Sequence, residues 1–177
     1  MFKYAGIGSR STPPDILEAM TKIGKSLAER GWTLRSGGAD GADLAFEKGC
    51  DEANGTKEIF LPWKKFNKST SPLFDVSDEA KQLASTLHPA WDNCNDAARR
   101  LHGRNCYQIL GKNLDNPVCM VVCWTMGGGV TGGTATAIKL GKKHNARIFN
   151  LAVDTEKTLE EMKAFIKMME EKLQPKA

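Results

Sequence analysis

Short apolar runs alternate along the chain with longer segments in which apolar residues recur every three or four positions. The short runs are typical of buried strands, and the periodic segments are typical of amphipathic helices. Because strands and helices alternate, the pattern predicts an α/β fold with a mostly parallel sheet flanked by helices. Strands are expected at about 3–7, 32–35, 57–61, 117–124 and 147–151, and helices at about 14–30, 41–48, 77–87, 93–110, 134–144 and 155–173.

One stretch breaks this alternation. Residues 62–76 contain Trp63, three lysines and two prolines, which predicts an irregular surface excursion. The chain has 177 residues, and we find no internal repeat or linker in it. We therefore expect residues 1–177 to form a single domain, with the excursion inside it.

Composition adds few constraints. Hydrophobic residues make up 41% of the chain and charged residues 26%, which is typical of a soluble globular protein. The net charge of +4 suits an anionic ligand but does not require a nucleic acid partner. We see neither a signal peptide nor a membrane segment and expect a cytoplasmic protein. Five irregularly spaced cysteines indicate reduced thiols, so we expect no metal and no cofactor.

Polar or glycine-rich turns follow three of the expected strands, and each turn leads into a helix. In a parallel sheet such turns gather at the carboxyl ends of the strands. Unpaired backbone N–H groups and helix N-termini favour an anion at this edge. Glycine lets the backbone approach phosphate oxygens closely. The three turns therefore predict a phosphate-binding site.

The first turn contains Gly8, Ser9 and Arg10. The Arg10 guanidinium is suited to clamp a phosphate with two hydrogen bonds, and Ser9 to donate a third. The alternative is an ordinary turn with a surface arginine.

The second turn contains Ser36, Gly37 and Gly38, followed by Asp40 and Asp43 near a helix start. Three glycines and two aspartates in eight residues exceed what a plain turn needs. Each aspartate either caps the helix or contacts ligand, where it would bind ribose hydroxyls or polarise a water. Asp40 and Asp43 are thus the candidate catalytic residues.

The third turn has five glycines in the eight residues 127–134 and is the strongest signal in the chain. Such a loop costs much backbone entropy, so packing alone explains it poorly. Thr134 is expected to cap the next helix and to face a phosphate. No G-x-G-x-x-G follows the first strand and no G-K-[ST] is present, so neither common nucleotide motif is met. The candidate phosphate contacts here are Gly128, Gly129, Gly132, Gly133 and Thr134.

A polar cluster, residues 102–105, is expected to interrupt a helix and to place Arg104 and Asn105 over the ligand. The alternative is a basic helix face. Trp91 and Asp92, just upstream, are candidates to stack on a base and to hydrogen-bond it.

These turns resemble those of the SLOG superfamily, which includes the DNA-processing protein DprA and the LOG-type phosphoribohydrolases. Gly8–Arg10, Ser36–Asp43 and Gly132–Thr134 carry the resemblance, which spans residues 3–151. The stretches 103–111 and 118–124 are similar to small members that contain this domain alone. The resemblance implies a Rossmann-like fold, a nucleotide-phosphate pocket and a homodimer or larger assembly.

The resemblance leaves several functions open. LOG enzymes carry P-G-G-x-G-T-x-x-E, whose glutamate helps to cleave the N-glycosidic bond of a nucleoside monophosphate. The run 132–137 has a small residue at the glutamate position, so hydrolysis would need Asp40, Asp43 or Asp92. One alternative is a non-catalytic nucleotide sensor or sequestering protein. Another is DprA-like single-stranded DNA binding, which the modest positive charge does not favour.

Overall fold

The strands form one five-stranded sheet in the computed structural model, which describes residues 1–174. The strand order is β3-β2-β1-β4-β5, and every pair of neighbours is parallel. The predicted α/β fold with a parallel, Rossmann-like sheet is therefore confirmed. The strands are β1 (Lys3–Gly6), β2 (Thr33–Ser36), β3 (Lys57–Ile59), β4 (Met120–Cys123) and β5 (Arg147–Asn150).

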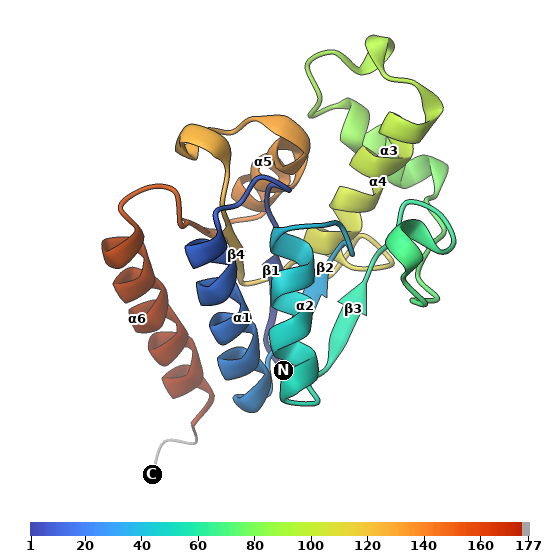
Figure 1. The fold of residues 1–177 in the computed structure, drawn as a ribbon. Helices are drawn as coiled ribbons and strands as arrows, with labels where there is room; N and C mark the ends of the chain where they lie inside the picture. Colours follow the sequence, from blue (N-terminus) through green and yellow to red (C-terminus); the bar gives the residue numbers. More distant parts are fainter. Residues whose placement is uncertain (175–177) are drawn as a thin grey trace.

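Helices cover both faces of the sheet (Figure 1). α1, α2 and α6 share one hydrophobic cluster with the sheet, whereas α4 and α5 share a second cluster on the opposite face, and α3 packs on α4. None of the helices within residues 1–174 is apolar and long enough to cross a membrane. The helices are α1 (Pro14–Glu29), α2 (Ala42–Glu52), α3 (Asp78–Ser85), α4 (Asp96–Leu110), α5 (Ala135–Lys143) and α6 (Thr155–Leu173).

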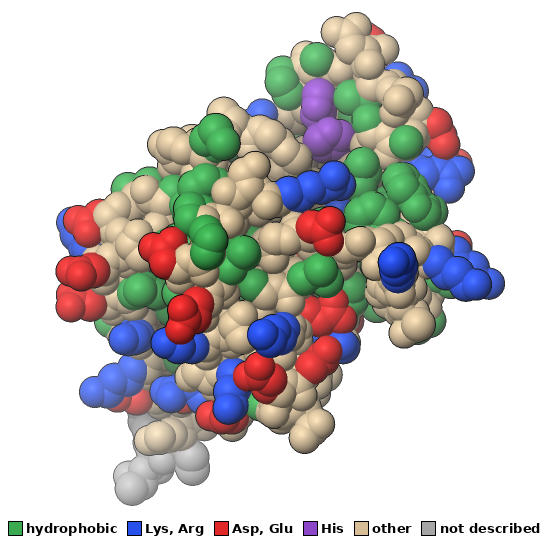
Figure 2. Space-filling model, viewed as in Figure 1, with side chains coloured by type: hydrophobic (Ala, Val, Ile, Leu, Met, Phe, Trp, Pro, Cys, Tyr) green, Lys and Arg blue, Asp and Glu red, His purple; other side chains and the backbone are tan. Residues whose placement is uncertain are grey.

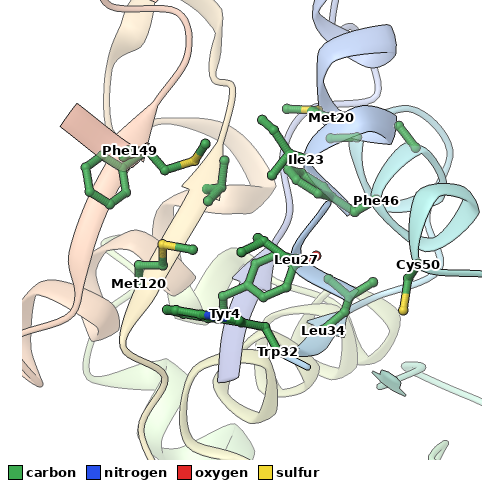
Figure 3. Packing of buried hydrophobic residues seen from close by; sticks show 14 of the residues in the cluster. Tyr4, Met20, Ile23, Leu27, Trp32, Leu34, Phe46, Cys50, Met120 and Phe149 are labelled. Carbon is green, nitrogen blue, oxygen red and sulfur yellow. The ribbon is translucent and has the colours of Figure 1, made fainter. Parts of the chain in front are cut away.

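The core between the sheet and α1 follows from the helical periodicity of the sequence. Met20, Ile23 and Leu27 lie on one face of α1 and are buried against the sheet. Figure 3 shows them beside Tyr4 of β1 and Phe46 of α2. Burial of such side chains contributes about 1.5–3 kcal/mol each. This packing fixes β1, and with it the turn that leaves β1, relative to α2.

Two expectations about the helix at 93–110 are wrong. The helix begins at Asp96, because the side chain of Asn95 accepts a hydrogen bond from the Ala98 N–H at 2.8 Å and caps it. The polar cluster at 102–105 does not interrupt it, since α4 runs unbroken to Leu110. Gly103 is a packing residue: a Cβ there would lie 2.7 Å from Val76 Cγ1.

The excursion after β3 is mostly irregular, as expected. It contains a distorted 3₁₀ turn at Phe66–Lys68, in which Asn67 has a left-handed φ of 48°, and Leu73 pairs with Phe60 in an isolated parallel bridge. The segment therefore extends the sheet edge beyond β3 before the chain enters α3.

Candidate functional site

A pocket of about 420 Å³ opens beyond the carboxyl ends of β1 and β4. After β1 the chain passes to α1 on one face of the sheet, and after β4 it passes to α5 on the other. The two connections diverge here, at the switch point where open α/β sheets bind ligands. The wall residues are Ile7, Gly8, Ser9, Arg10, Ala39, Asp43, Ala98, Leu101, His102, Arg104, Asn105, Gln108, Thr125, Met126, Thr131, Gly132, Gly133 and Thr134.

The turn after β1 brings all three of its candidate residues to the pocket. The Ser9 N–H donates to the Trp124 carbonyl at 3.1 Å, which joins this turn to the end of β4. A Cβ at Gly8 would lie 2.9 Å from Ala42 Cβ, so the turn fits closely under α2. Arg10 is exposed, and within residues 1–174 no hydrogen bond or ion pair engages its guanidinium. That side chain is free to meet a ligand.

The second turn lies mostly behind the pocket wall. Ser36, Gly37 and Gly38 are buried and do not line the pocket. The Ser36 hydroxyl donates to the Gly6 carbonyl at 2.6 Å, and the Gly38 carbonyl accepts from Asn67 at 2.9 Å. These residues position the wall through backbone contacts.

The two aspartates of this turn have different surroundings. Asp40 is exposed, stands outside the pocket wall and accepts a hydrogen bond from Asn67 at 3.0 Å. Asp43 lines the pocket and is 4% exposed. Burial raises the pKa of the Asp43 carboxyl to about 6, although the Arg104 charge and the Ala39 N–H, 3.3 Å away, oppose the rise. This carboxyl thus titrates near neutral pH.

Arg104 is the buried cation of the site. Its Nε donates to Asn105 Oδ1 at 3.0 Å, and its Nη1 donates to the carbonyls of Gly37 and Phe60. Burial lowers the pKa of Arg104 to about 10, opposed by Asp43 and assisted by the nearby charge of Arg10. The group stays charged at neutral pH, so two guanidinium groups face one pocket.

One face of α4 forms the side of the pocket. Ala98, Leu101, Asn105 and Gln108 recur at intervals of three or four residues and all line it. Gln108 was not among the sequence candidates, although this spacing from Asn105 is a signal that points to it. His102 lies on the same face, and burial, His88 and Arg104 lower its pKa.

The glycine-rich loop after β4 forms the opposite side. It contains two 3₁₀ turns, Met126–Gly128 and Gly132–Thr134. At its base Thr125 Oγ1 donates to the Gly129 carbonyl at 2.7 Å and accepts from Asn150 Nδ2 at 2.7 Å. Gly132, Gly133 and Thr134 line the pocket, whereas Gly128 and Gly129 lie outside its wall.

The prediction that the Thr134 side chain caps the following helix is wrong. Thr134 does precede α5, but its hydroxyl makes no capping hydrogen bond, because the 3₁₀ turn at Gly132–Thr134 leads directly into the helix. The first N–H groups of a helix lack partners within it. The pocket therefore receives both the start of α5 and a hydroxyl that is not used as a cap.

Trp91 and Asp92 lie outside the pocket wall. Both belong to the 3₁₀ turn Trp91–Asn93, where the Arg99 guanidinium stacks 5.3 Å from the Trp91 ring. Asp92 is exposed. The structure does not bring these two candidate base contacts to the other site residues.

Comparisons with known proteins connect part of the chain to a family. Residues 4–77 match the family model described as SLOG cluster4 family. This stretch, which is less than half of the chain, is similar to the SLOG superfamily. No curated protein matches the chain.

Solved structures have a similar fold over more of the chain than residues 4–77. The molybdenum cofactor carrier protein MCP from Chlamydomonas reinhardtii has a TM-score of 0.54 at 22% identity, over 93% of this chain and 86% of that one. The protein TM1055 has a TM-score of 0.51 at 19% identity, over 84% of this chain and 72% of that one. DprA from Streptococcus pneumoniae has a TM-score of 0.42 at 15% identity, over 87% of this chain and 60% of that one. At these identities the likeness describes the fold.

The position that corresponds to the glutamate of LOG enzymes is buried in this chain. Ala137 stands there and is fully buried in the cluster between the sheet and α5. Asp43 is the carboxylate among the pocket wall residues of the described chain. Any carboxylate chemistry in the pocket therefore falls to Asp43.

Proposed function

We propose that the pocket binds a nucleotide or a nucleotide-derived ligand by its phosphate. The observation that carries the proposal is the convergence of Arg10 and Arg104 on one pocket. Bringing two like charges together is unfavourable, as the effect of Arg10 on the Arg104 pKa indicates. A bound phosphate would relieve this repulsion and accept charge-assisted hydrogen bonds.

The wall opposite the arginines is suited to the same anion. Gly132, Gly133 and Thr134 lead into α5, whose N-terminal N–H groups and dipole favour negative charge. Asn105 Nδ2 donates to the Gly133 carbonyl at 2.7 Å and so ties this loop to α4. The phosphate would lie between the loop and the two guanidinium groups.

The rest of the pocket suits the remainder of a nucleotide. Its volume of about 420 Å³ lies within the range of about 300–1,000 Å³ typical of small-molecule sites. Ile7, Leu101 and Met126 supply apolar wall, while Asn105 and Gln108 supply amide groups. Apolar surface with a few placed polar groups is the usual composition of such sites.

Gly133 provides a test, because the fold gives no reason for glycine at this position. Its φ is not positive, and a Cβ built there has no atom within 4 Å. Gly133→Ala is therefore expected to leave stability unchanged but to place a methyl group where phosphate approaches. We expect affinity for a nucleoside monophosphate, measured by calorimetry, to fall by about 10-fold or more, equivalent to about 1.4 kcal/mol.

Gly129→Ala is the matched control. Gly129 belongs to the same loop, a Cβ there would meet just Thr131 Cγ2 at 3.6 Å, and the residue lies outside the pocket wall. Its affinity should match that of the unaltered protein. Equal affinities in both variants, or no binding from a panel of nucleoside monophosphates, would contradict the proposal. The molybdenum cofactor should be tested beside the nucleoside monophosphates, because the name of one structural neighbour refers to it.

Asp43 favours hydrolysis of the N-glycosidic bond as a second candidate function. With a pKa of about 6, this carboxyl is shared between its acid and carboxylate forms near neutral pH. The acid is suited to protonate a leaving base, and the carboxylate to stabilise positive charge on the sugar or to activate water. Release of free base that disappears in Asp43→Asn would support hydrolysis. Tight binding without release would favour the sensor or sequestering protein.

DNA binding is the third candidate function, and the salt dependence of the affinity distinguishes it from the other two. A DprA-like protein would bind single strands with an affinity that falls steeply as salt rises, because many phosphates are neutralised. A small ligand held by Arg10 and Arg104 would show a much shallower salt dependence.

A further inference from the structure

Three metal-binding side chains meet beside the pocket: His88, Cys94 and His102. Their candidate ligand atoms all lie within 4.8 Å of one another. His88 follows α3, Cys94 follows the 3₁₀ turn Trp91–Asn93, and His102 belongs to α4. Figure 2 shows two histidine side chains in contact at the surface, close to Lys and Arg side chains.

The distances between the candidate ligand atoms are slightly longer than those around a small metal ion. Cys94 Sγ lies 3.9 Å from His88 Nε2 and 4.0 Å from His88 Nδ1. The rings of His88 and His102 have centroids 4.4 Å apart at an interplanar angle of 65°. Tetrahedral zinc, with bonds of about 2.0–2.3 Å, holds its ligand atoms about 3.3–3.8 Å apart. The three ligand atoms would therefore have to approach one another by up to about 1 Å to bind zinc.

Contacts around the cluster hold its parts in place. His102 Nδ1 lies 3.1 Å from the hydroxyl of Thr136, a residue that is 2% exposed. A hydrogen bond at one ring nitrogen fixes the orientation of a metal-binding histidine and leaves the other nitrogen for the metal. Lys139 Nζ donates to the Leu87 carbonyl at 3.0 Å and anchors the backbone beside His88.

An ordinary packing contact explains the cluster less well. All three side chains are half-buried, and none belongs to the buried core of the protein. Thiolate and imidazole together are the ligands that zinc selects. No sequence motif points to this site, because five and seven residues separate the three ligands, unlike the spacing of known zinc motifs.

We propose that His88, Cys94 and His102 bind one Zn²⁺ at the rim of the pocket, with the fourth position open to water or a pocket ligand. On binding, the Cys94 thiol releases its proton to solvent and the thiolate forms the Zn–S bond. His88 exchanges its 3.1 Å contact with the Ala90 N–H for the metal if it binds through Nδ1. Because His102 also lines the pocket, the ion borders the ligand space. The proposal does not depend on nucleotide binding.

The test uses the full chain, freed of metal with a chelator, and the metal alone as probe. Zn²⁺ titrated against a chromophoric chelator should bind with a stoichiometry of one. Co²⁺ in its place should give a thiolate-to-cobalt charge-transfer band and the strong visible bands of tetrahedral cobalt. Cys94→Ser should abolish the charge-transfer band and weaken Zn²⁺ binding by more than about 100-fold.

Cys119→Ser and His144→Ala are matched controls. Cys119 is a half-buried free thiol and His144 an exposed histidine, and neither belongs to the cluster. Both should keep the affinity within about 2-fold. Thr136→Val keeps all three proposed ligands but removes the hydroxyl beside His102. It should lower the affinity for Zn²⁺ by roughly 10-fold. Circular dichroism of each variant checks folding.

Three outcomes would overturn the proposal. The first is the absence of a one-to-one zinc complex. The second is a cobalt spectrum that persists unchanged in folded Cys94→Ser. The third is a cluster that takes up Cu⁺ but not Zn²⁺. None of these outcomes bears on nucleotide binding, which the Gly133→Ala comparison tests separately.

Discussion

The two sides of the pocket use glycine for different physical reasons. On the side of β1 and β2, a Cβ at Gly41 would lie 2.7 Å from the Ser9 carbonyl oxygen, and one at Gly8 would lie 2.9 Å from Ala42. On the side of β4, a Cβ at Gly128 would lie 2.5 Å from Val153 Cγ2, but no atom lies within 4 Å of a Cβ built at Gly127, Gly132 or Gly133. The first side is closed by packing, and the second is open at these three glycines.

This difference separates structural glycines from candidate ligand glycines. A glycine whose Cβ would overlap backbone is required by the fold, whatever the protein binds. A glycine in open space is required either by a positive φ, as at Gly127 and Gly132, or by nothing in the fold, as at Gly133. The packed side thus fixes the pocket wall, and the open side is where a phosphate can come closest to the backbone.

The largest effect should come from Gly41→Ala on the packed side. The residue has a φ of 85°, and the new methyl group would press on the backbone of both Ser9 and Arg10. Overlap and strain together should lower the free energy of unfolding by about 3 kcal/mol. In a protein of this size that lowers Tm by roughly 6–12 °C, measurable by calorimetry. Gly133→Ala, measured in parallel, should stay within about 0.5 kcal/mol of the unaltered protein. Similar losses in both variants would remove the distinction between the two sides.

The next effect concerns the buried charge on the packed side. The pKa of Asp43 is about 6 in the folded protein, against about 3.9 in an unfolded chain. Between pH 4 and 6 the folded state keeps a proton that the unfolded state releases, so this group lowers stability as pH rises through that window. The loss of stability is absent below pH 4, and above pH 6 it is complete at about 3 kcal/mol.

Asp43→Asn should remove this dependence. The amide oxygen can still accept from the Ala39 N–H, which lies 3.3 Å from the carboxyl in the unaltered protein. Stability of the variant relative to the unaltered protein should therefore rise by about 3 kcal/mol between pH 4 and 7. Urea unfolding at a series of pH values measures the difference, in which contributions from other carboxyls cancel. A constant difference would mean that Asp43 titrates normally.

The sequence was sufficient to predict the fold because each element carries its own periodicity. The α6 helix begins and ends where the pattern indicated, at Thr155 and Leu173. Parallel strands bring their carboxyl ends together, so the turns after β1 and β4 were expected to meet, and they do.

The sequence could not separate residues that line the pocket from residues that support it. Ser36 and Gly37 look like ligand contacts in the sequence, but they are buried behind the wall, and Gly37 holds Arg104 through its carbonyl. Gln108 looks like an ordinary helical residue but faces the pocket. The meeting of His88 with His102 depends on how α3 turns back onto α4, which no local pattern encodes.

On the packed side, Arg10→Gln should affect binding without affecting stability. The guanidinium is exposed and makes no ion pair within residues 1–174, so the free energy of unfolding should change by less than about 0.5 kcal/mol. Loss of a charged hydrogen bond to phosphate should lower the affinity for a nucleoside monophosphate by about 10-fold, or about 1.4 kcal/mol. Calorimetric titration measures this loss. Arg30→Gln is the control, since Arg30 pairs with Glu170 away from the pocket, at 2.7 Å.

The smallest effect should come from Gly132→Ala on the open side. Its φ of 68° is left-handed, which costs an alanine about 1–2 kcal/mol. Alanine also restricts the unfolded chain and so returns about 0.4–1 kcal/mol, and no neighbouring atom resists the methyl group. The net loss of stability should be about 1 kcal/mol, roughly a third of that for Gly41→Ala although both glycines have positive φ. The stability loss in Gly132→Asn should be still smaller, because asparagine tolerates the left-handed region better than alanine does. A loss as large as that of Gly41→Ala would show that the loop after β4 packs as tightly at Gly132 as the turn before α2 does at Gly41, and the distinction between the two sides would then fail at this position.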